Sequence, residues 1–179
     1  MASGKNSYAD ELKSQMESAF GVSVFRGSYS TKIMEVAKDL FAIDEKNRIL
    51  LSKIAASMAE IDPHVWTNYL IRQIEKAGGP FIIDGIRFPD EEHRFRVRFE
   101  DFLVLRIKAD EARRIEAYRL EYGRYPTKGD LKARGEKNLL AVRHDLLLVN
   151  NYDREEMKLQ VRGIIDSIGD GSIRRLLRN

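Results

Sequence analysis

The sequence predicts an α/β fold with a parallel sheet, because short apolar segments alternate with longer segments of helical periodicity. The apolar segments cover residues 22–25, 81–85, 102–107 and 146–150. Helical patterns fill the intervals, which is the order that parallel strands joined by helical crossovers require. The chain has 179 residues, of which 43% are hydrophobic and 33% charged, so it can bury the core of one domain. We therefore expect a single domain over residues 1–179.

Six helical segments are predicted after the first helix. They cover residues 31–41, 45–59, 63–76, 89–98, 110–122 and 154–168. The first three separate the first two strand candidates, so we expect residues 30–77 to form a helical insertion. The fifth segment begins with Asp110 and Glu111, which place carboxylates at its positive end.

The first helix is preceded by a segment with phosphate-binding character. Ser3-Gly4-Lys5-Asn6-Ser7 corresponds to the second half of the pattern Gly-x-x-x-x-Gly-Lys-Ser/Thr, in which backbone N–H groups at a helix N-terminus bind phosphate oxygens. The lysine of that pattern adds a positive charge, and a hydroxyl can reach a metal ion. The first glycine and the apolar strand that should precede it are missing from this sequence. We expect Asn6 or Ser7 to cap the helix, and we expect this N-terminus to bind ATP weakly or not at all.

Composition restricts the functional classes. The sequence has no cysteine, which excludes disulfides, thiolate metal sites and thiol catalysis. No apolar run approaches the roughly 20 residues that span a membrane, so we expect no membrane partner and a cytoplasmic location. The formal net charge is +3, and the basic residues are interspersed with acids. That pattern favours small anionic ligands, and we do not expect nucleic acid as a partner.

A second chemical feature follows the strand predicted at 81–85. Asp84 and Arg87 stand at the carboxyl end of this strand, where open parallel sheets bind their ligands. A carboxylate suits Mg²⁺ and a guanidinium suits phosphate, so the pair predicts a phosphate and magnesium site. In the alternative interpretation, Asp84 caps a turn and Arg87 pairs with a neighbouring acid.

Four segments together carry a family resemblance: residues 3–12, 60–66, 84–92 and 148–151. In combination they resemble the deoxynucleoside monophosphate kinases of phage type, within the P-loop nucleoside monophosphate kinase superfamily. Animal phosphomevalonate kinase is a more distant likeness. The resemblance implies a three-layer P-loop kinase fold that transfers the γ-phosphoryl group of ATP to a (deoxy)nucleoside monophosphate with Mg²⁺.

The resemblance assigns donor-side roles by position. It places ATP at Ser3, Gly4, Lys5, Asn6 and Ser7. Lys5 would bridge the donor phosphates, and Ser7 would stand near the metal ion.

The metal and acceptor roles follow in the same way. Asp84 would assist the metal ion, and Arg87 would hold phosphate between the two substrates. Lys32 and Arg26 would bind the acceptor monophosphate, and Trp66 would border the acceptor site. A second interpretation of Trp66 is an indole that packs between helices.

Residues 110–143 correspond to the mobile lid of these kinases. Arg113 and Arg114 are the candidates to offset the charge on the transferring phosphoryl group. The alternative is a solvated basic face paired with acids at helical spacing. Those acids are Glu111, Glu116 and Glu121.

The family sheet has a central first strand that is absent from the chain as given. Its absence would leave unpaired backbone groups on the neighbouring strands. We expect the neighbours to close up, or a homo-oligomer or partner chain to complete the sheet, or the natural product to begin further upstream. The leading hypothesis is therefore a monophosphate kinase, and the alternative is a catalytically impaired relative that binds a nucleotide or a protein.

Overall fold

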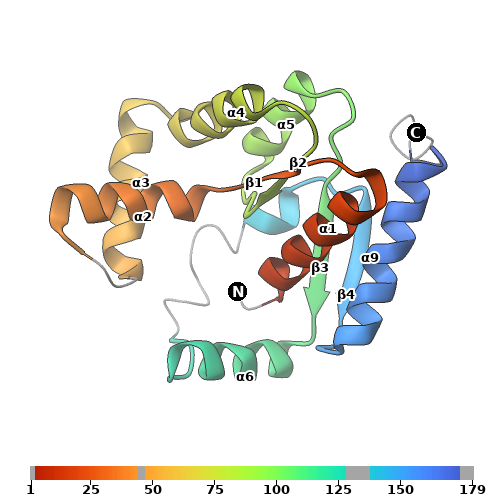
Figure 1. Cartoon of the computed structure of the whole chain (residues 1–179). Coiled ribbons are helices and arrows are strands. Elements are labelled where there is room, and N and C mark those ends of the chain that lie inside the picture. The colour runs from red at the N-terminus through yellow and green to blue at the C-terminus, as the bar shows by residue number, and fades with distance from the viewer. Residues whose placement is uncertain (1–2, 44–46, 128–137, 174–179) are drawn as a thin grey trace. The chain divides into compact units, whose positions relative to one another are not determined.

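We describe a computed structural model of the chain over residues 3–43, 47–127 and 138–173. The chain consists of two compact units: unit 1 comprises Met1–Val22 and Ile86–Asn179, and unit 2 comprises Ser23–Gly85. Figure 1 shows the mixed α/β composition of both units. None of the helices in the described ranges is long and apolar enough to cross a membrane.

The described residues form four strands, which pair in parallel. In unit 2, β1 (Phe25–Ser28) pairs with β2 (Phe81–Asp84). In unit 1, β3 (Leu105–Ala109) pairs with β4 (Leu146–Asn150). Where the sequence predicts one parallel sheet, the described residues therefore form two sheets of two strands. Among the described residues, no further strand adds to the edges of either sheet.

The first strand lies three residues later than predicted. Phe25 is in register with Phe81, and its N–H donates to the carbonyl of Pro80 at 3.0 Å. Pairing with β2 therefore decides where β1 begins. The apolar pattern at 22–25 lacks this long-range information, and Val22 is exposed.

Unit 1 is built on one buried face of the β3–β4 pair. Two helices, α1 (Lys5–Phe20) and α9 (Arg154–Gly169), lie side by side against this face (Figure 1). The buried core comprises Tyr8, Leu148, Met157, Val161, Ile164, Ile165 and Ile173. The Tyr8 hydroxyl donates to Gln160 Oε1 of α9 at 3.1 Å, so the phenol is satisfied where it is buried.

Within its described residues, unit 1 also contains α5 (Pro89–Arg98), α6 (Glu111–Tyr122) and the short 3-10 helix η1 (Leu139–Ala141). Asp110 caps α6, because its carboxylate accepts from the N–H of Arg113 at 3.1 Å. Arg106 of β3 donates to the carbonyls of Leu139 and Val142, which attaches η1 to that strand.

A buried charged network joins α5 to the starts of β3 and β4. Arg96 donates to Asp145 Oδ2 at 2.8 Å and also pairs with Glu92. The same Asp145 oxygen accepts from the N–H of Val104 at 2.7 Å. The Asp145 side chain is only 4% exposed, so these donors replace its lost hydration. Beside the network, the Phe95 ring stacks on Phe102 with ring centroids 5.2 Å apart.

Unit 2 packs three helices with the β1–β2 pair: α2 (Tyr29–Phe41), α3 (Arg48–Ile61) and α4 (Val65–Ala77). Gly27 lets α4 approach β1 closely. A Cβ at this position would lie 2.8 Å from Ile83 Cδ1 and 3.1 Å from Leu70 Cδ2. Buried Ala37, Leu51 and Ile54 form a second core between the helices.

Removing the Asp145 carboxylate should strongly destabilise unit 1. In Asp145→Ala, the Arg96 guanidinium and the Val104 N–H both lose an acceptor, and we expect the free energy of unfolding to fall by about 3 kcal/mol. Urea denaturation measures this loss. Asp166→Ala is the matched control, because it breaks an exposed pair with Arg162 and should cost less than about 1 kcal/mol. Equal effects of the two variants would contradict a structural role for the network.

Candidate functional site

The N-terminus of α1 is formed by a left-handed glycine. Gly4 has φ 81° and ψ 11°, and α1 begins at the next residue, Lys5. The first backbone bond of the helix runs from the N–H of Tyr8 to the carbonyl of Gly4 at 3.1 Å. Helix geometry gives the N–H groups before Tyr8 no partner of the helical i→i−4 type, and they stand at the positive end of the helix dipole. Such an end suits an anion.

The predicted capping of this helix is wrong. Asn6 and Ser7 lie within the first turn of α1, and no side chain caps the helix. The positive φ of Gly4 is the reason, because it turns the chain into the helix two residues before Asn6. The first turn therefore consists of Lys5, Asn6 and Ser7.

Asn150, the last residue of β4, holds this turn in place. Its Nδ2 donates to the carbonyl of Ser3 at 2.9 Å, and its Oδ1 accepts from the N–H of Tyr152 at 2.8 Å. Asn150 is 6% exposed. A Cβ at Gly4 would collide with Asn150 Nδ2, so the glycine is also required by this close approach.

An open cleft of about 650 Å³ begins at this turn. Ligand sites for small molecules are commonly of this size. The cleft is lined by Gly4, Ser7, Asp10, Glu11, Ser14, Ala117, Asn150, Tyr152, Asp153, Arg154 and Met157. These residues come from α1, α6, the β4–α9 turn and the first turns of α9, all within unit 1.

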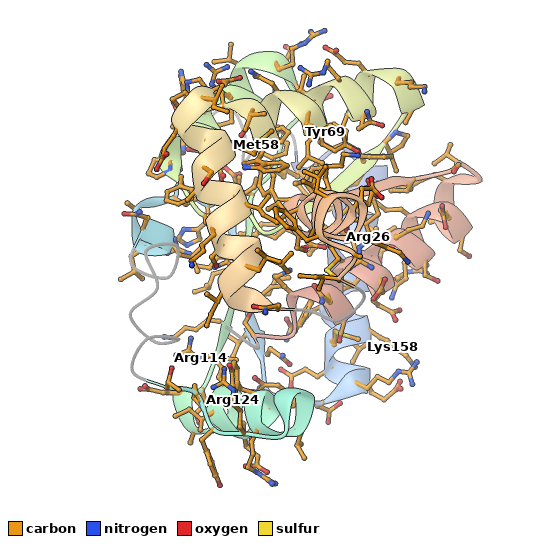
Figure 2. All side chains as sticks on the ribbon, turned by 90° about the vertical axis from the view of Figure 1, so that its left-hand side faces the viewer. Arg26, Met58, Tyr69, Arg114, Arg124 and Lys158 are labelled. Carbon is orange, nitrogen blue, oxygen red and sulfur yellow. The ribbon has the colours of Figure 1, made fainter. Side chains whose placement is uncertain are left out.

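Arg113 and Arg114 of α6 lie near the β4–α9 turn. Arg113 Nη1 donates to the carbonyl of Asn151. Arg114, labelled in Figure 2, has a buried Nε with no hydrogen-bond partner among the described residues. Neither guanidinium forms a salt bridge with a carboxylate in the described part of the chain. By contrast, Arg119 pairs with Glu116 at 2.5 Å, as the solvated-face interpretation predicts.

The pKa of Tyr152 depends on the charged groups around this turn. Burial raises the pKa of its phenol above the ordinary value of 10.0, and Asp110 acts in the same direction. Arg113 and Arg114 oppose this shift through their positive charges. Both arginines therefore act electrostatically on a residue that lines the cleft.

The loop lysine and serine occupy different positions at this site. Lys5 Nζ donates to Asn6 Oδ1 at 2.9 Å. Ser7 lines the cleft, where its hydroxyl could meet a ligand or a hydrated ion. Gly4 and Ser7 line the cleft, and Ser3, Lys5 and Asn6 are their neighbours in the chain.

Arg87 is held by its backbone. Glu91 Oε2 accepts from the N–H groups of Arg87 and Phe88, at 2.8 and 3.2 Å. Burial raises the pKa of the Glu91 carboxyl above its ordinary value of 4.5, while these two N–H groups and the Arg87 charge oppose the shift. Glu91 therefore fixes the turn from which the Arg87 side chain extends.

In unit 2, Asp84 is paired with Arg26. Arg26 Nη2 lies 3.3 Å from Asp84 Oδ2, and the Asp84 side chain is 8% exposed. Both residues belong to the adjacent strands β1 and β2. The expected metal-assisting carboxylate and one expected acceptor-binding arginine thus neutralise each other.

Lys32 and Trp66 lie elsewhere in unit 2. Lys32 Nζ donates to Glu35 at 2.9 Å and lies 5.4 Å from the centre of the Tyr69 ring. The hydrogen bond to Glu35 raises the pKa of the Lys32 amine. The Trp66 indole N–H donates to the carbonyl of Ala55 at 3.1 Å, and its ring packs against the helical core, as the second interpretation of this residue describes.

The described residues contain no group of three or more His, Asp or Glu side chains that could hold a metal ion. Magnesium is commonly bound through substrate phosphates and water with only one or two protein oxygens. The Ser7 hydroxyl in the cleft can supply one such oxygen.

Comparison of the sequence with known protein families gives no match, and comparison with curated proteins gives none either.

Two residues of the site were not predicted for their roles. Asn150 enters the sequence argument only as a member of the segments 146–150 and 148–151, and Glu91 only as a member of 84–92 and 89–98. A polar residue directly after the apolar run 146–149 is a signal that could have singled out Asn150, because ligands collect at the carboxyl ends of parallel strands. Its partner Ser3 is 147 positions away, which no local pattern reveals.

The raised pKa of Glu91 predicts a pH-dependent contribution to stability. The folded chain keeps the Glu91 proton to higher pH than the unfolded chain, so this contribution is complete below about pH 4.5 and declines as pH rises through the folded pKa. In Glu91→Gln this decline should be absent. Urea denaturation of both proteins from acid to neutral pH gives the difference, and Glu100→Gln controls for the change in net charge. A constant difference between wild type and Glu91→Gln would contradict the assignment.

Proposed function

We propose that this chain is a nucleotide kinase-like protein that transfers the γ-phosphoryl group of ATP to a (deoxy)nucleoside monophosphate. The observation that carries the proposal is the left-handed turn at Gly4, which presents the N-terminus of α1 at the rim of a cleft. The family resemblance of the sequence supports the same activity. The proposal includes the P-loop kinase fold and the Mg²⁺ dependence of that family.

Donor phosphates belong at the Gly4 end of the cleft. The N–H groups of the first turn and the positive helix end favour anions there. Further along the α1 wall, Asp10 and Glu11 line the cleft, and their carboxylates disfavour a phosphate. The charge distribution therefore supports one orientation, with the phosphates at Gly4 and the nucleoside toward Asp10, Glu11 and Ser14.

Phosphoryl transfer depends on positioning and on compensation of the charge on the transferred group. Lys5 and the first-turn N–H groups would hold the donor phosphates. Arg113 and Arg114 would approach the phosphates from α6, in keeping with the lid role that the resemblance implies. Magnesium, when bound with ATP, supplies Lewis-acid compensation of phosphate charge.

The acceptor side of the proposal rests on unit 2. Lys32 and Arg26 carry the positive charge that an acceptor monophosphate needs. Asp84 would assist the metal ion once Arg26 engages a phosphate. A second copy or a partner chain that supplies a strand also belongs to the proposal.

The second candidate function is nucleotide or protein binding without turnover. Two charged groups expected in catalysis already contact other side chains: Lys5 donates to Asn6, and Asp84 pairs with Arg26. Binding of ATP without formation of a diphosphate product would favour this second candidate.

Replacing Lys5 tests the donor site. The purified chain is incubated with ATP, Mg²⁺ and each deoxynucleoside monophosphate, and diphosphate products are separated by chromatography. We expect Lys5→Ala to lower kcat/KM by about 100-fold, because the substitution removes the positive charge of the Lys5 ammonium group from the donor phosphates. Lys158→Ala is the matched control, since Lys158 pairs with Glu155 on α9. Wild-type protein that forms no diphosphate with any acceptor would contradict the kinase proposal.

Replacing Arg114 tests the role of α6. We expect Arg114→Met to lower kcat by about 10-fold or more with a smaller change in the KM for ATP, because the charge acts on the transition state. Arg119→Met on the same helix removes a guanidinium already paired with Glu116 and should change kcat little. Steady-state kinetics of both variants give the comparison. Equal losses of kcat in both variants would contradict a specific role of Arg114 in the transition state.

A further inference from the structure

The Asn150 side chain connects two chain segments that meet at the cleft. One side of its amide, Oδ1, accepts from the N–H of Tyr152, two residues further along. This bond forms an Asx-type turn. Tyr152 adopts φ 60°, a left-handed conformation that is uncommon for a residue with a side chain. The other side of the amide, Nδ2, donates to the carbonyl of Ser3.

Both bonds require an amide at position 150. A carboxylate accepts but does not donate, so aspartate could keep the Tyr152 turn but would repel the Ser3 carbonyl. Alanine would lose both bonds. Asn150 is nearly buried, so a lost partner leaves a polar group without compensation.

The contact also fixes the backbone at Gly4. The glycine packs so closely on Asn150 Nδ2 that a Cβ would collide with it. The direction of the first turn of α1 therefore depends on where the Asn150 amide lies. That first turn carries the N–H groups and the lysine assigned above to phosphate binding.

We propose that Asn150 is a positioning residue that sets the N-terminus of α1 for a phosphate ligand, by holding the Ser3 carbonyl and the Tyr152 turn at once. The inference rests on the donor site of the proposed function and adds a residue to it. Asn150 acts through Ser3 and Gly4.

Four single variants test this assignment. Asn150→Ala and Asn150→Asp are compared with Asn151→Ala and Asn151→Asp, because the Asn151 amide instead donates to Glu156 at 3.1 Å. Calorimetry measures binding of ATP and of adenosine, which lacks phosphates. Loss of one or two hydrogen bonds corresponds to about 10-fold weaker ATP binding in both Asn150 variants, with adenosine changed less than about 2-fold. ATP binding as in wild type, or equal weakening for adenosine, would overturn the inference.

A double-mutant cycle separates positioning from loss of stability. Gly4→Ala should weaken ATP binding because its Cβ meets the Asn150 amide and its φ is left-handed. In the Asn150→Ala background the collision is removed, so the added effect of Gly4→Ala should be smaller. Thermal melting of every variant monitors folding. Strictly additive effects would count against the contact between these two residues.

A readout without ligand separates this inference from the proposed function. The backbone amide NMR shifts of Lys5, Asn6 and Ser7 should move in Asn150→Ala and stay close to wild type in Asn151→Ala. If wild-type protein binds no ATP, the donor-site proposal fails, and the NMR shifts still decide whether Asn150 positions the turn. Unmoved shifts would overturn the positioning role even where ATP binds.

Discussion

The architecture of unit 1 depends on burial of one face of the β3–β4 pair under α1 and α9. Leu148 contributes to that face, while Tyr8, Met157 and Val161 cover it from the two helices. This apolar contact is the main favourable term, at about 25 cal/mol for each Å² removed from water. Because both helices begin near the carboxyl end of β4, the same packing places two helix N-termini beside Asn150. The candidate site is therefore a consequence of how the core is covered.

Much of the secondary structure could be predicted because its signals are local. The strand at 81–84 follows Gly78-Gly79-Pro80, and the helix at 89–98 begins at a proline, so local residues mark both starts. The position of β1 could not be predicted, since pairing with β2 decides it. The division into two strand pairs likewise depends on contacts between distant segments. Local sequence patterns indicate helical or strand periodicity, but they do not determine which strands pair.

The candidate site shows the same division. Gly4 and Lys5 could be found from a short motif, because phosphate binding at a helix start needs these residue types in this order. The place of Arg113 in the sequence indicates a lid arginine, and in the structure its side chain donates to the Asn151 carbonyl. The pairing of Asp84 with Arg26 was not predicted, because the two residues are 58 positions apart and meet only when β1 lies beside β2. Residue type indicates chemistry, but tertiary pairing decides which charges are already compensated.

The order of elements in unit 1 has a consequence for synthesis of the chain. Unit 2 is continuous in sequence, whereas unit 1 combines α1 with elements that begin at Ile86. Domains generally fold as units while the ribosome extends the chain from its N-terminus. The apolar side of α1, with Leu12 and Met16, must therefore wait for β4 and α9 before it can be covered. During translation, unit 2 can complete its fold first, and the cleft beside α1 is among the last features to form.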